Sequence, residues 1–338
     1  MGYVLTNLGL YKQYSDDPRI RNGVVVAARD RSSIRFSTQA AYWDGNWHLL
    51  PDPLPDTERS VARNINSNLT QIVGHYSLKG SSTKSRAAIW SKISEAWQVT
   101  TLPLPQEYSI SIAIGNSDSG SIICGSGHPN NKAEEPLIWS VDKNSQWTPD
   151  LLPFPNTRGY AIGEDNLTGD VVGNIIELSV WRAVRWIKSG TDWHYELLDT
   201  SSMGEGGPEK ISSDVNCVCE GVCAGAIRVG DGNSKAVIWN INGSIQDLRV
   251  GDHTEAHGYR NGTVTGTDSS SGVWKGFAWD ETKQIQDIHP PGWDWSFPND
   301  VDHDGTIVGV MGMGIPRDAN AEKQIYILTP DQSFDGIR

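Results

Sequence analysis

The chain has 338 residues, of which 37% are hydrophobic and 20% charged, with 35 glycines and 17 prolines; this profile is typical of a turn-rich, all-β protein. Its formal net charge of −13 repels phosphate backbones and anionic membrane surfaces, so we expect neither nucleic acid nor membrane among its partners. No apolar run reaches the length of about 18 residues that spans a bilayer.

The N-terminal segment, residues 3–9, predicts a strand rather than a signal peptide. It precedes the first complete repeat, so we expect it to complete the last repeat, around residues 300–330, and to close a ring. If a leader precedes this sequence, we expect a secreted or secretory-pathway protein, and otherwise a cytoplasmic one. Four N-glycosylation sequons fit secretion but also arise by chance in such a chain: Asn68, Asn166, Asn242 and Asn261.

Tryptophans recur along the chain with gaps of 47, 49, 47, 53 and 40 residues, and a further 47 residues reach Tyr326. They are Trp43, Trp90, Trp139, Trp186, Trp239 and Trp279. Each period holds four short β runs, as in residues 60–65, 71–76, 86–90 and 97–103. A period of 40–50 residues with four strands predicts an all-β fold, a single seven-bladed β-propeller over residues 1–338 with four-stranded antiparallel blades. An open solenoid is the alternative, but the sequence shows no caps for one.

Two stretches carry a resemblance to a known family. Residues 166–173, followed by Trp186, and residues 301–309 match units that run Ile-Asn-x-x-Gly-x-Val-Val-Gly and then Ala-x-x-Trp. The chain therefore resembles the bacterial and fungal repeat family named after a His-Ala-Phe (HAF) motif, often labelled a probable extracellular repeat. The resemblance is loose and covers almost the whole chain. It implies a propeller and says little about activity.

Four tryptophans break the period, and all four fall in connections that a propeller places on one face. Trp181 and Trp274 lie between the second and third strands of their repeats, and Trp293 and Trp295 lie between consecutive repeats. Such connections on a rigid scaffold commonly carry binding residues. We expect these aromatics either to line a ligand site, together with Phe297, or to pack loops against the blades.

The first strand of each repeat is expected to line a central channel. Its polar residues are Arg19, Arg21, Arg63, Asn64, Arg158, Tyr160, Lys210, His257, Tyr259, Asn299 and Asp300. Side chains alternate along a strand, so only about half of them face inward. Among these we take Tyr160, Asn64 and Asp300 as ligand-binding candidates, and His257, Arg63, Arg158 and Lys210 as catalytic candidates.

The connections between repeats differ from one another, which favours one asymmetric site over the repeated sites of a lectin. We expect one small organic ligand, apolar or conjugated, in an aromatic-walled pocket at the loop-rich mouth of the channel. No nucleotide, nucleophile or metal motif is present, so we expect no cofactor. The hypothesis is a cofactor-free cyclase, such as a natural-product hetero-Diels–Alderase. A lyase or hydrolase on a sugar acid, a lectin-like propeller and a protein-interaction scaffold stay open.

Two further motifs have competing interpretations. Asp300, Asp302 and Asp304 begin like a calcium loop, but Val308 and Met311 stand where later ligands are needed, and the segment also fits a turn. Cys217 and Cys223 could form a hairpin disulfide in a secreted protein. Zinc is disfavoured there because a fourth ligand is missing.

Overall fold

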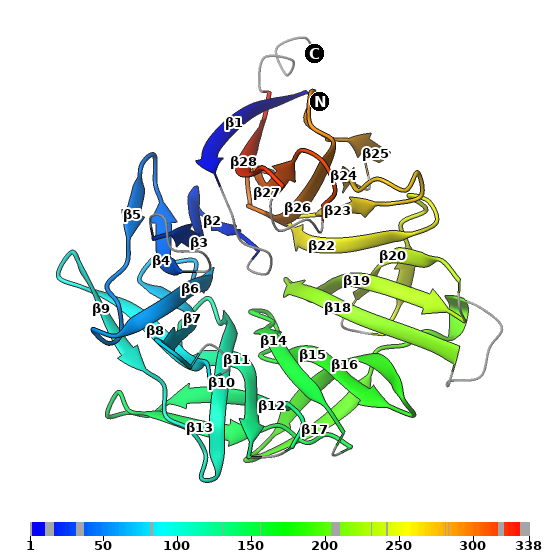
Figure 1. The fold of residues 1–338 in the computed structure, drawn as a ribbon. Coiled ribbons are helices and arrows are strands. Elements are labelled where there is room, and N and C mark those ends of the chain that lie inside the picture. The colour runs from blue at the N-terminus through cyan, green and yellow to red at the C-terminus, as the bar shows by residue number, and fades with distance from the viewer. Residues whose placement is uncertain are drawn as a thin grey trace.

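The computed structural model describes residues 2–10, 17–31, 37–81, 84–130, 132–155, 157–203, 210–230, 232–240, 243–280, 282, 284–316 and 321–331. These residues form 28 strands and a short 3-10 turn, η1 (Ser201–Met203), and contain no α-helix. The strands make a ring of antiparallel sheets around a central channel, a β-propeller-like arrangement (Figure 1). No helix in this described part of the chain is long and apolar enough to cross a membrane.

Four strand positions recur from the channel outward, here called A to D. The A strands are β2 (Arg19–Arg21), β6 (Thr57–Ile65), β10 (Tyr108–Asn116), β14 (Gly159–Glu164), β18 (Ile211–Cys219), β22 (Thr254–Arg260) and β26 (Trp295–Val301). The B strands are β3 (Val24–Asp30), β7 (Gln71–Leu78), β11 (Ile122–Pro129), β15 (Val171–Glu177), β19 (Val222–Val229), β23 (Thr263–Asp268) and β27 (Ile307–Gly312). The C strands are β4 (Thr38–Trp43), β8 (Arg86–Ile93), β12 (Glu135–Val141), β16 (Val180–Ser189), β20 (Ser234–Asn240), β24 (Lys275–Asp280) and β28 (Lys323–Pro330). The D strands are β5 (Trp47–Leu49), β9 (Ala96–Thr101), β13 (Trp147–Leu151), β17 (Asp192–Leu197), β21 (Ile245–Asp247), β25 (Gln284–Asp287) and β1 (Tyr3–Leu10).

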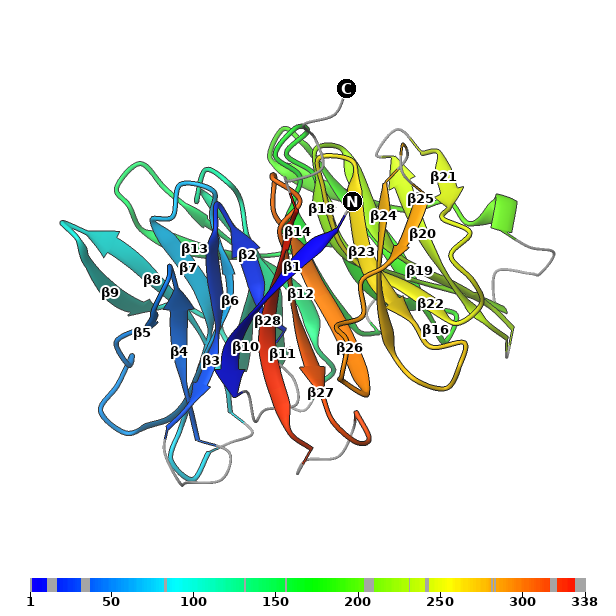
Figure 2. The same ribbon diagram turned by 90° about the horizontal axis from the view of Figure 1, so that it is seen from above.

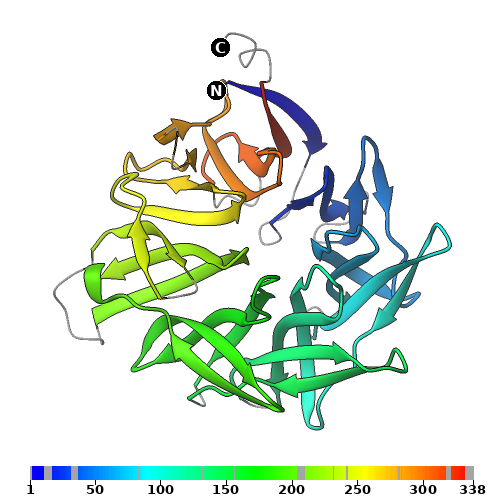
Figure 3. The ribbon, with the colours of Figure 1, turned by 180° about the vertical axis from the view of Figure 1, so that it is seen from behind.

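Most of these strands pair in four-stranded antiparallel sheets. One larger, eight-stranded sheet contains β2–β5 and β6–β9, which are joined by a parallel bridge between Thr38 and Arg59. The N-terminal strand β1 pairs antiparallel with β28, so both ends of the strand sequence meet in one sheet (Figure 2). Seen from behind, the D strands lie at the perimeter of the same ring (Figure 3). Each A–D set is called a unit below and is named after its A strand.

The recurring tryptophans of strand C hold neighbouring units together. Four of them are fully or almost fully buried, and each indole Nε1 donates to a carbonyl at the exit of the preceding unit, at 2.7–2.8 Å. The pairs are Trp90 with Pro51, Trp139 with Pro103, Trp186 with Pro153 and Trp239 with Asp199. The period therefore records a packing contact and a hydrogen bond that join consecutive units.

Tyr326 does not occupy the tryptophan position. In the β14 unit, Trp186 pairs with Val171, two residues before the strand B glycine Gly173. In the β26 unit, Tyr326 pairs with the glycine itself, Gly309, and Leu328 stands where the tryptophan would be. The spacing of 47 residues was a coincidence of loop lengths, although Tyr326 is also fully buried.

A glycine recurs in strand B because strand A has a bulge opposite it. The bulges shift the register by one residue, as between Val215 and Cys217. A Cβ atom on the facing glycine would then lie only 1.9–2.5 Å from a strand A carbonyl oxygen, at Gly74, Gly125, Gly173, Gly225, Gly266 and Gly309. The paired part of β2 has no such shift, and there the equivalent residue is Ala27.

Candidate functional site

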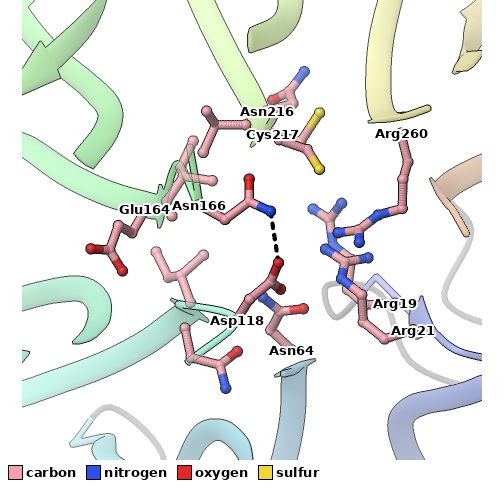
Figure 4. A pocket seen from close by; sticks show the side chains of 15 residues that line it. Arg19, Arg21, Asn64, Asp118, Glu164, Asn166, Asn216, Cys217 and Arg260 are labelled. Atoms are coloured by element: carbon pink, nitrogen blue, oxygen red, sulfur yellow. Dashed lines mark hydrogen bonds between the residues drawn. The ribbon is translucent and has the colours of Figure 1, made fainter. Parts of the chain in front are cut away.

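A pocket lies in the central channel, at the end where the A strands run into the A–B turns (Figure 4). Its cavity of about 60 Å³ is lined mainly by polar side chains. The lining includes Arg19, Arg21, Asn64, Asn116, Asp118, Glu164, Asn166, Asn216, Cys217, Cys219 and Arg260. Several units contribute to the lining, each with different residues, so the pocket is asymmetric.

The A–B turns explain why some units place unusual side chains here. In four units the turn starts with a small polar residue, whose side-chain oxygen accepts backbone N–H groups of its own turn or of a neighbouring turn. These four residues are Asn66, Ser117, Asp165 and Asp302. The β2, β18 and β22 units carry Arg21, Cys219 and Arg260 at that position. These three side chains do not cap a turn and line the pocket instead.

These three exceptions share a tighter turn. Two residues with positive φ connect the strands: Asn22–Gly23, Glu220–Gly221 and Asn261–Gly262, with φ between 47° and 78°. Positive φ at both positions is the signature of a type I′ hairpin, which closes by backbone hydrogen bonds alone. The turn-starting residue is thereby released from its capping role, because the hairpin is stable without it.

Arg21 is the charge-compensated arginine of the pocket. Its Nη1 lies 2.6 Å from the Asp300 Oδ2 atom, which also accepts the N–H of Ile20 at 3.1 Å. Burial alone would raise the pKa of Asp300, but Arg21, Arg19 and Arg260 lower it below its usual value. One buried carboxylate therefore faces three guanidinium groups.

Arg19 and Arg260 make no direct ion pair of this kind, although both lie near enough to Asp300 to lower its pKa. Arg19 Nη1 donates to the backbone carbonyls of Asn299 at 2.9 Å and His257 at 3.4 Å. Arg260 is 3% exposed; its Nη1 lies 2.8 Å from His303 Nε2, and its Nε has no hydrogen-bond partner in the described part of the chain. Among the residues that the structure describes, no carboxylate lies within ion-pair distance of Arg19 or Arg260.

The opposite wall offers acceptors. The Asp118 carboxylate accepts from Asn166 Nδ2 at 3.0 Å and from Ser67 Oγ, which orients it (Figure 4). Beside it, Asn116 Nδ2 donates to Gln71 Oε1 at 3.1 Å, and the Oδ1 atom of Asn116 is buried without a donor among the described residues. Asn64 Oδ1 is in the same situation.

Other ionisable groups at the pocket are neutral or partly so. Burial raises the pKa of Glu164 to about 7, and its carboxyl group points away from the arginines (Figure 4). Burial also raises the pKa of Cys217 to about 11 and that of Cys219 to about 12, so both thiols stay protonated near neutral pH. Protonated thiols are poor nucleophiles, which disfavours a reactive cysteine here.

Of the ligand-binding candidates from the sequence, only Asn64 lines this pocket, and Asp300 lies directly behind it. Arg158, Tyr160 and Trp181 come together near the other end of the channel. The Arg158 guanidinium lies 5.5 Å from the Trp181 ring centre, and the Tyr160 ring 5.6 Å from it. No described pocket accompanies this cluster, so the ligand-binding role expected of these side chains stays a prediction.

His257, Phe297 and Trp274 form a second aromatic stack, with ring centres 4.3 Å and 5.5 Å apart. His257 Nε2 lies 2.9 Å from Thr267 Oγ1, and burial lowers the pKa of this histidine. The ring is thus neutral and enclosed by its own neighbours.

The remaining candidates lie apart from the pocket. Trp295 is 3% exposed and belongs to the hydrophobic core, so its expected role as a ligand-facing residue is wrong. Trp293 packs against a neighbouring part of the core. Lys210 is exposed, and Arg63 is half-buried outside the pocket lining.

The three candidate calcium ligands have other partners in this structure. Asp300 pairs with Arg21, Asp302 accepts from the backbone of Gly23, and Asp304 caps its own turn. In the part of the chain that the structure describes, no cluster of three or more His, Cys, Asp or Glu side chains could hold a metal ion.

The hairpin disulfide is not formed. Cys217 pairs with Ala224, and Cys223 pairs with Val218, so the two cysteines occupy adjacent register positions and point to opposite faces of the sheet. All four cysteines are free. Among the sequons, Asn68, Asn166 and Asn261 lie exposed on A–B turns, and Asn242 lies outside the described residues. Glycosylation stays a prediction.

No protein-family model matches the sequence, and no curated protein is significantly similar to it. Solved structures with a similar fold include Pyrococcus horikoshii acylaminoacyl peptidase (14% identity, 92% of this chain and 50% of that chain, TM-score 0.58). Prolyl oligopeptidase B from Galerina marginata matches at 8% identity over 92% and 47% of the two chains, TM-score 0.58. A Mycobacterium tuberculosis puromycin-hydrolyzing peptidase is similar with 13% sequence identity over 93% of this chain and 50% of that chain, with a TM-score of 0.53. The chain spans about half the length of these proteins, and at such identities the similarity establishes a β-propeller-like fold and nothing further.

Proposed function

We propose that the protein binds one small ligand through an anionic group, such as a carboxylate, in the central channel pocket. The observation that carries this proposal is Arg260, a residue only 3% exposed that lines a polar cavity and has no carboxylate at ion-pair distance among the described residues. The Asp300 carboxylate compensates this wall only in part, because three guanidinium groups share it, and an incompletely compensated buried charge is costly. A bound anion supplies the missing partner.

The neighbouring charges support the same conclusion. Arg19 and Arg21 line the pocket beside Arg260, and Asp300 is the carboxylate that compensates this wall. Guanidinium groups present their donors in a planar fork that matches a carboxylate. The cavity of about 60 Å³ holds roughly four to six water molecules, so it suits a group of about that many non-hydrogen atoms.

This proposal keeps the single asymmetric site expected from the sequence and changes its chemistry and its place. The pocket is polar and lies at the A–B turn end, whereas the aromatic residues gather near the other end. The cofactor-free cyclase, the lectin-like propeller and the interaction scaffold stay hypotheses that no contact described here supports. A lyase or hydrolase acting on a small acid is compatible with the arginines and needs a demonstrated turnover.

We also infer that the ring has seven blades and that the chain is a divergent member of the HAF-like repeats. The single parallel bridge in the eight-stranded sheet supports treating β2–β5 and β6–β9 as two blades. The recurrence of the strand B glycine and the strand C tryptophan supports a common repeat. Solving an experimental structure tests the blade count directly.

The binding proposal is tested by titrating acetate and glycolate into the protein by calorimetry at pH 7 in a low-chloride buffer. We expect one site per chain and a loss of affinity of at least about tenfold in Arg260→Gln. Arg228→Gln is the matched control, because Arg228, on β19, is ion-paired with Glu255 and does not line the pocket. Unchanged carboxylate binding in Arg260→Gln, or no binding to the unaltered protein, contradicts the proposal.

A further inference from the structure

The channel pocket has two walls of opposite character. Arg19, Arg21 and Arg260, from β2 and β22, gather on one side, and Asp118 faces them from the turn between β10 and β11 (Figure 4). Burial alone would lower the pKa of Arg21, but Asp300 and, more weakly, Asp118 hold it above its usual value. A ligand between the two walls meets both signs of charge.

The buried polar atoms that lack a hydrogen-bond partner among the described residues also differ between the two walls. On the arginine wall the unpartnered atom is a donor, Arg260 Nε. On the other wall the unpartnered atoms are acceptors, Asn116 Oδ1 and Asn64 Oδ1. The orientation of the Asn116 amide is fixed, since its Nδ2 donates to the side chain and the backbone carbonyl of Gln71 at 3.1 and 3.3 Å. Buried polar atoms are paired in the great majority of cases, so these orphans mark positions for ligand atoms.

We infer that the ligand is a small zwitterion, a primary α-amino acid of about the size of glycine, with its carboxylate at Arg260 and its ammonium group at Asp118 and Asn116. This inference rests on the proposed function and specifies its ligand. An ammonium group has three donors and no acceptor, which matches the Asp118 carboxylate and the amide oxygens. A carboxylate has only acceptors, which matches Arg260 and Arg19.

The wall that carries Asp118 and Asn116 disfavours other anions that could compete with the amino acid. Phosphate or sulfate fills the space with acceptor oxygens on every side, and those on the far side would face the Asp118 carboxylate. A plain carboxylate such as acetate leaves Asn116 Oδ1 without a donor and brings no positive charge to the Asp118 carboxylate. Glycine has five non-hydrogen atoms and fits the cavity of about 60 Å³, whereas a long side chain does not.

The experiment is a calorimetric titration at pH 7 with three probes that differ at one end: glycine, glycolate and acetate. We expect glycine to bind the unaltered protein at least about tenfold more tightly than acetate, with glycolate between them. In Asp118→Asn we expect the preference for glycine over acetate to fall to within about threefold, with acetate affinity retained. Asp142→Asn, on the exposed turn between β12 and β13, removes the same charge outside the pocket and should change nothing.

The outcomes distinguish carboxylate binding at Arg260 from binding of a zwitterion between Arg260 and Asp118. If acetate binds as tightly as glycine to the unaltered protein, the zwitterion is wrong while carboxylate binding at Arg260 stands. If neither probe binds, both are wrong. A thermal melt of each variant checks folding, and the ranking of the probes on the unaltered protein remains decisive even if Asp118→Asn does not fold.

Discussion

Replacing Gly225 with alanine tests why the repeat keeps a glycine in strand B. Gly225 lies opposite the bulge of β18, and an added Cβ would stand 1.9 Å from the carbonyl oxygen of Asp214 and 2.9 Å from Val215 Cα. Ordinary contact begins near 3.4 Å, so the two strands must separate by about 1.5 Å. The obstructing atoms belong to the backbone of a paired strand, which cannot rotate away as a side chain does.

Overpacking of this kind costs about 1–3 kcal/mol, and we expect the upper part of that range because the bulge carbonyl is fixed by strand pairing. The melting temperature should fall by roughly 2–4 °C for each kcal/mol. The assay is thermal and urea unfolding followed by far-ultraviolet circular dichroism. Gly163→Ala is the control, because its Cβ meets only Val218 Cγ1 at 3.4 Å. If Gly225→Ala unfolds within about 0.5 kcal/mol of the unaltered protein, the steric account of the repeat is wrong.

Three further changes have defined outcomes. Trp186→Phe removes the donor to the Pro153 carbonyl and should cost about 1–3 kcal/mol in urea unfolding. Asp300→Asn leaves the buried charge of Arg21 uncompensated, and we expect a loss of about 3–5 kcal/mol in the same assay. Burial raises the pKa of Glu164 from 4.5 to about 7, so the folded protein holds a proton that the unfolded chain has released. Stability from this group is present below pH 4.5 and is lost as the pH rises toward 7; Glu164→Gln should abolish that part of the pH dependence of the melting temperature.

The regular tryptophans predicted the architecture because four of the six perform the same task in their units. A buried indole with one fixed hydrogen bond to the preceding unit cannot be exchanged freely, so the period is visible in the sequence. The all-β, propeller-like arrangement of repeated four-stranded sheets is confirmed by the structure. Tyr326 was misplaced because spacing along the chain does not determine register, and two residues separate it from the tryptophan position.

The candidate site was predicted poorly because leftover aromatics were treated as the functional signal. Trp295 is a core residue, and Trp274 and Trp181 find ring or guanidinium partners near them. Whether a side chain packs or faces a ligand depends on the neighbours it meets in three dimensions, which spacing does not supply.

A better signal was present in the turns. Asn22–Gly23 and Asn261–Gly262 mark two-residue hairpins, and the arginines directly before them depart from the Asn, Ser or Asp of other units. Aligning the repeats at the A–B turns would have singled out Arg21 and Arg260. Their convergence on one wall still required the closed ring, because residues 21 and 260 are distant in the chain and meet only when β1 joins β28.

The central claim is that a carboxylate binds at Arg260 in the channel. The most direct measurement is a crystal structure of the protein soaked with glycine. The account predicts ligand density in the channel pocket, with a carboxylate oxygen about 3 Å from a nitrogen of the Arg260 guanidinium and the amino group facing Asp118. Ligand density near Trp181 or Trp274 with an empty channel pocket, or no density under conditions where calorimetry detects binding, would contradict it.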